Sequence, residues 1–416
     1  MQISIPKRFY LVLGMFSLTL LLYIDRVCIS AAKGPISEAL NLTDKQFGWI
    51  MSVFTLGYAL FQTPSGMWAD KYGPRKVLTA IVFIWSVFTT LTGTAFSFIY
   101  LIIVRFLFGA GEAGAFPSLS KAVFRWYPVK ERGIVTGVNF SGSRLGAAFA
   151  LPLVAIMITS LGWRVSFYML GIVGILWGIF WYLWFRNDPT EKSGISPKEL
   201  NYILKNRQQN NNPGNATFAF RDLARSKNMW LVMIQYFSSN FIFFFCLSWM
   251  FPYLEETYEL TMIKAGLYGS IPLICGACGN WVSGLLVDFI YQKGKLKMSR
   301  YLPAIIGFSF AVAGLLSIVH AQNIQTAIVF LSIAIFGADM TLSPSWSFCI
   351  DIGKNNAGAV SGTMNMAGNL GSFITVLAFP YLYSWTGSNT VFFYIAAIFG
   401  FVAIITWFLM KPEKGL

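Results

Sequence analysis

The chain has 416 residues, of which 56% are hydrophobic and only 12% are charged, whereas about 25% of the residues in a soluble domain are charged. Its apolar residues form long continuous runs, which are typical of membrane-spanning helices and exclude both a soluble protein and a transmembrane barrel. The net charge of +14 favours nucleic acid at first sight, but the basic residues fall in short loops between the apolar runs, as the positive-inside rule expects. We therefore expect an all-α integral membrane protein that does not bind nucleic acid.

The apolar runs predict about twelve membrane-spanning helices, because each is long enough to cross a bilayer. Their approximate ranges are 14–30, 47–69, 77–95, 98–122, 133–159, 165–185, 229–252, 263–287, 302–320, 326–350, 357–383 and 391–410. We expect two six-helix halves, residues 1–186 and 229–416, joined by a cytoplasmic linker at residues 187–228. Within the linker, Ser196, Pro197 and Glu199 form a helix-start pattern that predicts one short helix.

Lysine and arginine residues cluster in the loops that follow the second, fourth and eighth predicted spans. The positive-inside rule places such loops in the cytoplasm. With an even number of spans, both termini are then cytoplasmic. We expect a multi-pass protein of the plasma membrane, which is the inner membrane in bacteria.

Two charges lie inside the fourth apolar run. Arg105 and Glu112 are seven residues apart, so two helical turns place them on one face. A charge at the bilayer centre costs roughly 2.5–3.5 kcal/mol, so this face should turn away from lipid. Gly109 and Gly114 let a neighbouring helix approach closely, and Pro117 permits a bend. The face is either a moving ion site or a static ion pair that fixes helix registry; we favour the ion site, because charges inside the membrane are usually functional.

The predicted spans contain three basic and three acidic side chains: Arg26, Arg105, Arg144, Asp25, Glu112 and Asp339. A buried arginine keeps its proton and needs an anion, either a protein acid or a bound ligand. If a substrate carboxylate takes the arginine from Glu112 or Asp25, the freed acid binds a proton, and substrate and proton favour each other.

We assign Arg105 the role of carboxylate clamp and Glu112 that of the coupled proton site. Asp25 is then a second protonation site, and the two acids could exchange roles. Asp339 either lines the cavity or pairs with Arg144.

Several polar side chains in different spans suit a hydroxylated ligand, since they supply hydrogen-bond donors and acceptors, and one tryptophan offers a flat face. They are Tyr58, Gln62, Ser343, Trp346, Asn365 and Asn369. Each residue alone is better explained by hydrogen bonds between helices. Taken together, they favour a cavity.

A faint internal repeat supports the division into halves. The sequence from Ser65 through Gly66 to Asp70 ends the second span, and the sequence from Ser283 to Asp288 ends the eighth in the same way. Repeated halves of this kind are typical of transporters.

The stretch Gly66-Met-Trp-Ala-Asp-Lys-Tyr-Gly-Pro-Arg-Lys76 resembles the loop motif of the major facilitator superfamily at every required position. Five shorter segments resemble the anion:cation symporter family within it: 23–26, 58–66, 105–117, 343–346 and 365–369. That family includes bacterial transporters of galactonate, hexuronate and glucarate and the animal sialic-acid transporter. The resemblance implies a major facilitator fold and a proton-driven symporter of an organic acid that works by alternating access.

The resemblance also implies roles for particular residues. Asp25 and Glu112 match proton-carrying acids, and Arg26 and Arg105 match arginines near the central cavity. The remaining matches line the substrate site: Tyr58, Ser343, Trp346 and either Asn365 or Asn369.

One segment departs from the family pattern. Ser143 and Arg144 lie in the fifth span, where a small or neutral polar residue is usual. We include both among the expected substrate residues. The extra cation, Arg144, would either favour a substrate with two negative charges or pair with an acidic side chain of the protein.

Asp70, Arg75 and Lys76 follow the second span, at the expected inner face. We expect them to form a latch, with Asp70 near a helix end and the cations paired with acids of a neighbouring helix. Asp288 is the counterpart of Asp70 in the second half. The positive-inside rule alone also explains why basic residues lie in this loop. We expect these residues both to set the topology and to form the latch.

We therefore predict a proton-coupled symporter that imports an organic anion, a uronate, aldonate or aldarate. The alternatives are an exporter or exchanger of another anionic small molecule in the same fold, and a non-transporting membrane receptor. An enzyme is not expected, because the chain has no nucleophile–base pair, metal cluster or phosphate loop. The expected partners are the organic anion, the proton and the lipid bilayer, with no cofactor, no metal ion and a monomeric state.

Overall fold

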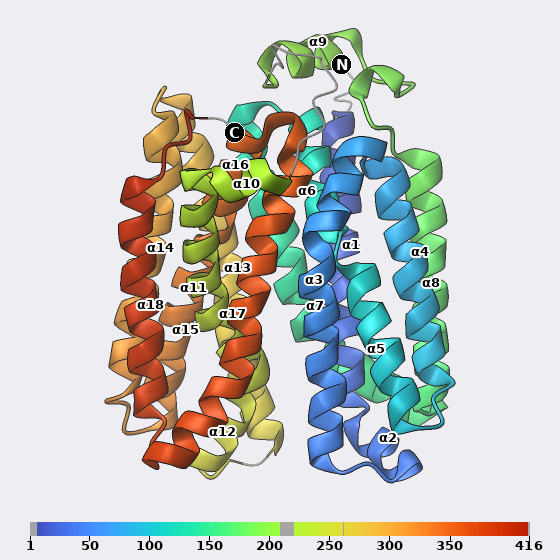
Figure 1. Cartoon of the computed structure of the whole chain (residues 1–416), viewed down its shortest axis with the longest axis vertical. Helices are drawn as coiled ribbons and strands as arrows, with labels where there is room; N and C mark the ends of the chain where they lie inside the picture. The colour runs from blue at the N-terminus through green and yellow to red at the C-terminus, as the bar shows by residue number, and fades with distance from the viewer. Residues whose placement is uncertain (1–5, 209–219, 261, 415–416) are drawn as a thin grey trace, which may run out of the picture. The chain divides into compact units, whose positions relative to one another are not determined.

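The computed structural model describes residues 6–208, 220–260 and 262–414 (Figure 1). Within these ranges the chain forms α-helices labelled α1 to α18 and three short 3-10 helices, and no strand. The predicted all-α fold is confirmed.

The chain divides into two compact units. Unit 1 comprises Met1–Val129, Gly146–Asn215 and Gly353–Met366, and unit 2 comprises Lys130–Leu145, Ala216–Ile352 and Ala367–Leu416. Two long helices, α7 (Arg132–Leu161) and α17 (Ala357–Thr386), each contribute their first part to one unit and their remainder to the other. The division into halves at residues 186 and 228 stays a prediction, and residues 209–219 of the expected linker lie outside the described part of the chain.

Unit 1 is built from helices of the first part of the chain. They are α1 (Lys7–Ala31), α2 (Lys33–Leu40), α3 (Asp44–Tyr72), α4 (Pro74–Gly93), α5 (Phe98–Glu112), α6 (Ala115–Trp126), α8 (Trp163–Trp184) and α9 (Pro197–Asn206). Helices α4 and α8 lie side by side, as do α3 and α5 (Figure 1). Ser196 accepts a hydrogen bond from the backbone N–H of Glu199 at 3.2 Å at the start of α9, where the sequence predicts a short helix.

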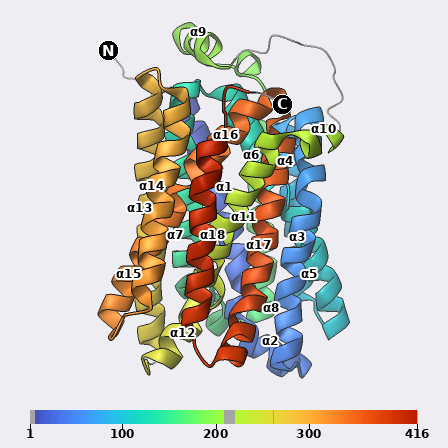
Figure 2. The same ribbon diagram turned by 60° about the vertical axis from the view of Figure 1, so that its left-hand side comes forward.

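Unit 2 is built from helices of the second part of the chain. They are α10 (Phe220–Arg225), α11 (Lys227–Ser248), α12 (Met250–Thr257), α13 (Met262–Gln292), α14 (Leu296–Ile318), α15 (Ile324–Met340), α16 (Leu342–Gly353) and α18 (Thr390–Leu409). Helices α13, α14 and α15 pack together, and α18 packs against α11 and α14 (Figure 2).

Nine helical stretches in the described residues are long and apolar enough to cross a membrane. One of them, Ile324–Thr386, has 63 residues and contains α15, α16 and α17, which is more than one crossing needs, since about 20 residues suffice. Helices α3 and α7 are not among the nine, but with 29 and 30 residues they are also long enough. The helices are consistent with the twelve-helix major facilitator fold predicted from the sequence.

Three predicted spans, the fourth, the seventh and the tenth, are each divided into two helices at a break. In the fourth and the tenth, a proline follows the break closely. Pro117 is the third residue of α6, and Pro344 is the third residue of α16. A proline has no N–H to donate to the carbonyl four residues earlier, so the helix weakens there. At the break in the tenth span, the Ser283 hydroxyl takes the place of the missing N–H of Pro344 and donates to the carbonyl of Met340.

Helices α3 and α5 touch backbone to backbone. A Cβ atom added to Gly109 would lie 2.1 Å from the carbonyl oxygen of Phe54, and one added to Gly57 would lie 2.3 Å from that of Phe106. Only glycine fits at both positions, as the sequence predicted for Gly109. This contact holds Tyr58 of α3 next to the charged face of α5.

We expect Gly109→Ala to destabilise the protein by roughly 1–3 kcal/mol, because the added methyl group must push the α3 backbone away. Thermal unfolding of the purified protein in detergent measures the change. Gly48→Ala in α3 is the matched control, because its added Cβ meets nothing within 4 Å. Equal unfolding temperatures for the two variants would show that the α3–α5 contact is not tight.

Candidate functional site

Unit 1 encloses four charged side chains, which we call the charged cluster: Asp25 and Arg26 of α1, and Arg105 and Glu112 of α5. Asp25, Arg105 and Glu112 are at most 2% exposed, and the Arg26 side chain is 14% exposed. The cluster therefore faces the protein interior, as the helical spacing of Arg105 and Glu112 predicted. With two acids and two bases, its formal charge is zero when all four groups are ionised.

Arg26 is the partner of Glu112. Its Nε donates to Glu112 Oε1 at 2.7 Å, and its guanidinium lies 4.4 Å from the centre of the Tyr58 ring and 5.3 Å from that of Phe54. Among the described residues, Nη2 of Arg26 and Oε2 of Glu112 have no hydrogen-bond partner. The pair is thus formed by one strong, charge-assisted hydrogen bond and keeps unused donor and acceptor positions.

Arg105 is held by aromatic rings. Its guanidinium lies 4.5 Å from the centre of the Phe108 ring and 5.0 Å from that of Phe54, a cation–π geometry. In the described part of the chain, its Nε has no hydrogen-bond partner.

Asp25 has charged neighbours and no close hydrogen bond, although the indole of Trp85 lies within reach of its carboxylate. Neither of its carboxylate oxygens accepts one from a described residue, yet the carboxylate lies within electrostatic reach of Glu112 and Arg105.

Two further predicted residues of unit 1 lie where α3 approaches α17. Gln62 is fully buried, one turn after Tyr58, and a Cβ atom added to Gly362 of α17 would lie 2.6 Å from the Gln62 carbonyl oxygen. Next to it, the hydroxyls of Thr63 and Thr363 are 3.1 Å apart. Asn365 follows on α17 and is 5% exposed.

Unit 2 contains the buried Arg144, the third arginine expected inside a membrane span. Arg144 of α7 donates from Nε and Nη2 to the two oxygens of Asp339 of α15, at 2.7 and 2.5 Å. Its guanidinium lies 3.5 Å from the centre of the Phe243 ring. Gly276 makes room for this pair, because a Cβ atom there would lie 2.2 Å from Asp339 Oδ2. Of the two possibilities for Asp339, pairing with Arg144 is the one observed.

The remaining predicted binding residues are buried in unit 2. Trp346 donates from its indole nitrogen to the Tyr236 hydroxyl at 2.9 Å and lies 5.3 Å from Phe140, centre to centre. Ser343 donates to the carbonyl of Gly133 at 2.7 Å. Ser143 and Asn369 are also buried. The predicted substrate residues are therefore distributed over both units.

Asp70 binds the first turn of α17. Its carboxylate accepts hydrogen bonds from the backbone N–H of Gly358 at 3.1 Å and of Ala359 at 2.7 Å. Gly66, one turn earlier, allows the contact, since a Cβ atom there would lie 2.2 Å from the Gly358 carbonyl oxygen. A carboxylate at a helix N-terminus satisfies free N–H groups and is favoured by the helix dipole.

Asp288 binds the first turn of α7 in the same way. Its two oxygens accept hydrogen bonds from the backbone N–H of Gly133 and Ile134, both at 2.8 Å. Gly284 has the same role as Gly66, because a Cβ atom added to it would lie 2.7 Å from the Gly133 carbonyl oxygen. The sequence repeat therefore corresponds to a repeated contact, in which a glycine and an aspartate one turn apart cap another helix.

Other charged residues around these caps were not predicted. Lys121 of α6 lies 3.1 Å from Asp70 Oδ1 and donates to the carbonyl of Asn355. In unit 2, Asp351 pairs with Arg132 at 3.2 Å and with Arg300 at 2.7 Å. Lys121 lies inside the fourth apolar run, and Asp351 directly follows the tenth. A charge at such a place was the signal available in the sequence.

The two basic residues of the predicted latch have different surroundings from those expected. Arg75 donates from Nε to the carbonyl of Tyr182 at 2.8 Å, and its backbone N–H donates to Asn187. Lys76 is exposed. Arg75 thus binds the end of α8 through a backbone carbonyl.

No group of three or more His, Cys, Asp or Glu side chains in the described ranges has a geometry that could hold a metal ion.

Comparisons with known proteins agree with this architecture. A family model of the Major Facilitator Superfamily matches residues 15–376. The chain is 33% identical to the probable sulfoacetate transporter SauU of Cupriavidus necator, over 97% of this chain and 94% of that protein. It is 29% identical to the probable galactarate/D-glucarate transporter GarP of Escherichia coli, over 92% and 89% of the two chains.

Among solved structures, the proton:xylose symporter XylE has the same fold, with a TM-score of 0.75 and 18% identity, over 98% of this chain and 96% of that one. The resemblance found in the sequence motifs is confirmed. The chain belongs to the Major Facilitator Superfamily of membrane transporters.

Proposed function

We propose that this protein is a symporter that couples the import of an organic anion, a sugar acid, to the entry of a proton by alternating access. The observation that carries the proposal is the buried Arg26–Glu112 pair, with Asp25 and Arg105 beside it. The names of related proteins, which include transporters of sulfoacetate and of galactarate or glucarate, support an anionic substrate.

In the first step, a carboxylate of the substrate replaces Glu112 on Arg26. A guanidinium presents parallel N–H groups that match a carboxylate, and the Nη2 of Arg26 is the donor with no partner among the described residues. Arg26 is also the most exposed member of the charged cluster. These features favour Arg26 as the exchanging arginine. Arg105 then supplies a second fixed positive charge, and its role as the clamp stays a prediction.

In the second step, Glu112 takes up a proton once Arg26 has left it. An ionised carboxylate without a partner in an apolar interior is costly, so protonation is the favoured outcome. One substrate charge and one proton leave the net charge of the cluster unchanged. Asp25 offers a site for a second proton, which a dianionic sugar acid would need to remain neutralised.

The two aspartate caps are proposed as the latch that alternating access must release. Asp70 and Asp288 each hold the first turn of a helix that contributes to both units, α17 and α7. Each cap rests on two hydrogen bonds to a charged carboxylate, worth roughly 1.5–3 kcal/mol each, and substrate binding of micromolar affinity, about 8 kcal/mol, is large enough to offset its release. Lys121 neutralises Asp70 and steadies the first cap.

Replacing Glu112 by Gln should lower the rate of gradient-driven uptake at least about tenfold, because the coupling free energy is lost with the titrating group. Exchange of substrate across the membrane at equal pH should persist, since Arg26 remains. Proteoliposomes with an imposed proton gradient and labelled D-glucarate, L-galactonate or sulfoacetate measure both rates.

Glu38→Gln is the matched control for this substitution, because Glu38 is exposed on α2. It should behave like the unmodified protein. Undiminished gradient-driven uptake by the Glu112→Gln variant would refute the proton assignment. Uptake that needs an anion inside the vesicle but no proton gradient would instead favour an exchanger.

Arg26→Ala should weaken substrate binding by roughly tenfold or more, which corresponds to the loss of one charge-assisted hydrogen bond. Arg26→Lys should give an intermediate affinity, because lysine keeps the charge but not the fork. Calorimetric titration of the same substrates in detergent measures the affinities. Unchanged affinity in the alanine variant would place the carboxylate clamp elsewhere, with Arg105 the next residue to test.

Asp70→Asn should speed hydrogen exchange at Gly358 and Ala359 by roughly fivefold, because a weakened cap lets the first turn of α17 open more often. Asp288→Asn should do the same at Gly133 and Ile134 of α7. Each variant is the control for the other in hydrogen-exchange mass spectrometry. If exchange is unchanged at the capped residues in either variant, that aspartate is not a latch.

A further inference from the structure

The linker helix α9 binds the start of α1. Its buried residues are Glu199 and Ile203, which lie one turn apart on one face. The Glu199 carboxylate accepts hydrogen bonds from the backbone N–H of Lys7 at 2.9 Å and of Arg8 at 3.1 Å. It therefore satisfies two of the N–H groups that the first turn of a helix leaves free.

Further contacts of Arg8 oppose rotation of α1 at the same place. Its Nη1 lies 3.4 Å from Glu199 Oε1, and its guanidinium lies 4.9 Å from the centre of the Tyr202 ring of α9. The hydroxyl of Tyr127, which follows α6, donates to the Arg8 carbonyl at 2.6 Å. Bonds to both the backbone and the side chain of one residue resist sliding as well as turning of the helix.

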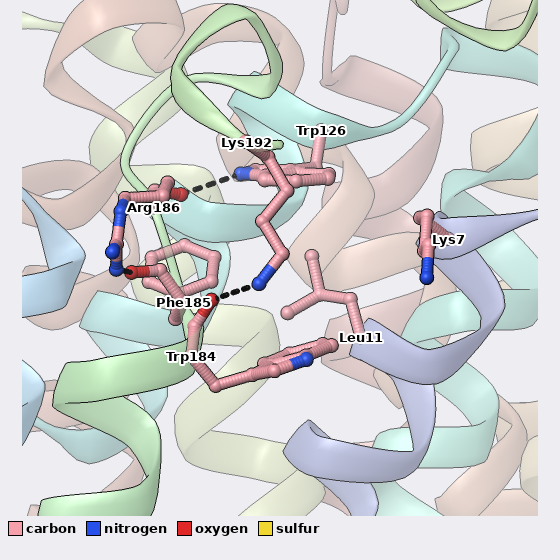
Figure 3. A pocket seen from close by; sticks show the side chains of 7 residues that line it. All are labelled: Lys7, Leu11, Trp126, Trp184, Phe185, Arg186 and Lys192. Atoms are coloured by element: carbon pink, nitrogen blue, oxygen red, sulfur yellow. Dashed lines mark hydrogen bonds between the residues drawn. The ribbon is translucent and has the colours of Figure 1, made fainter. Parts of the chain in front are cut away.

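The end of α6 is joined to the same part of the linker. Arg207, which follows α9, donates from Nη1 to the carbonyl of Arg125 at 3.2 Å. Trp126 donates from its indole nitrogen to the carbonyl of Arg186 at 2.9 Å (Figure 3). We call α9 together with Arg207 the linker clamp, because it holds the start of α1 and the end of α6.

The two clamped helices lead to the charged pair. Arg26 lies on α1, and Glu112 is the last residue of α5, which leads into α6. In the described part of the chain, α1 and α5 do not pack closely against each other, whereas α3 and α5 do. The long Arg26 side chain bridges the distance to Glu112. Contacts elsewhere must therefore set the position of α1 relative to α5, and the linker clamp reaches both, α1 directly and α5 through α6.

A displacement at the start of α1 is transmitted to Arg26. The helix is continuous from Lys7 to Ala31 and contains no proline, so its internal hydrogen bonds keep the rise at about 1.5 Å per residue. A slide of the first turn then moves Arg26 by a similar amount. Its hydrogen bond to Glu112, now at 2.7 Å, weakens once the two atoms are more than about 3.2 Å apart.

We propose that the linker clamp positions the transport site, with Glu199 as the positioning residue that keeps Arg26 in register with Glu112. The inference rests on the proposed function, which gives this pair its role. With the clamp intact, Arg26 keeps Glu112 ionised until a substrate anion arrives. With the clamp weakened, the pair opens more often, and Glu112 takes up a proton before any substrate binds.

Thermal unfolding of the purified full-length protein in detergent tests the positioning without any transport. Glu112→Gln removes one partner of a buried ion pair, and Glu199→Gln weakens the clamp, so each variant should unfold at a lower temperature. The double variant should lose at least about 1–2 °C less than the sum of the two losses, because the clamp then has no ion pair to hold. Additive losses, which are usual for distant sites, would overturn the proposal.

Glu191→Gln is the matched control, because Glu191 is an exposed acid of the 3-10 helix η2 (Pro189–Glu191), outside the clamp. Its effect on the unfolding temperature should add to that of Glu112→Gln. Non-additivity of the same size for this control would show a general effect of linker charge and would also overturn the proposal.

Proton uptake on binding of D-glucarate gives a second readout that a loss of stability alone does not change. Glu199→Gln should take up about half as many protons per bound anion as the unmodified protein, if its ion pair is open half of the time. Glu191→Gln should match the unmodified protein. Normal uptake by Glu199→Gln would refute the clamp alone, whereas no uptake by the unmodified protein would refute the proposed function.

Discussion

The Arg26–Glu112 ion pair is the interaction on which the proposed transport cycle depends. Taking two ions out of water costs several kcal/mol for each, and their mutual attraction offsets this only while they remain together. Neither group can leave the other without a replacement charge. In the proposed cycle, a substrate anion replaces Glu112 on the arginine, and a proton replaces Arg26 on the acid. The low polarity of the interior would then link two binding events that water would keep independent.

Tight helix contacts in unit 1 hold this pair in position. Backbone contacts at Gly57 and Gly109 fix α3 against α5, so Tyr58 and Glu112 keep their distance. The aspartate caps are different, because each depends on a pair of hydrogen bonds to the end of one helix. Tight contacts at glycines, together with caps that depend on a few hydrogen bonds each, suit a protein whose helices move as rigid bodies.

Much of the fold follows from local sequence properties. Apolar length predicted the helices, because helix formation depends on residues close in the chain. The repeated Gly66–Asp70 pattern indicated a repeat, but it did not indicate the helix ends that Asp70 and Asp288 bind, which lie far away in the sequence. The partner of Glu112 is Arg26, and this choice depends on how α1 is rotated against α5. That rotation results from packing of many side chains, which no short motif records. Likewise, Arg75 binds a backbone carbonyl. Because every residue has a carbonyl group, the sequence does not indicate which one Arg75 binds.

The most direct test of the exchange between Glu112 and the substrate is proton uptake on binding, measured without a membrane. Purified protein in weakly buffered detergent solution at neutral pH is mixed with D-glucarate, L-galactonate or sulfoacetate, and the pH change is converted to protons per bound anion. We predict that binding takes up about one proton for each substrate carboxylate that displaces Glu112. Saturable binding with no proton uptake would contradict the exchange.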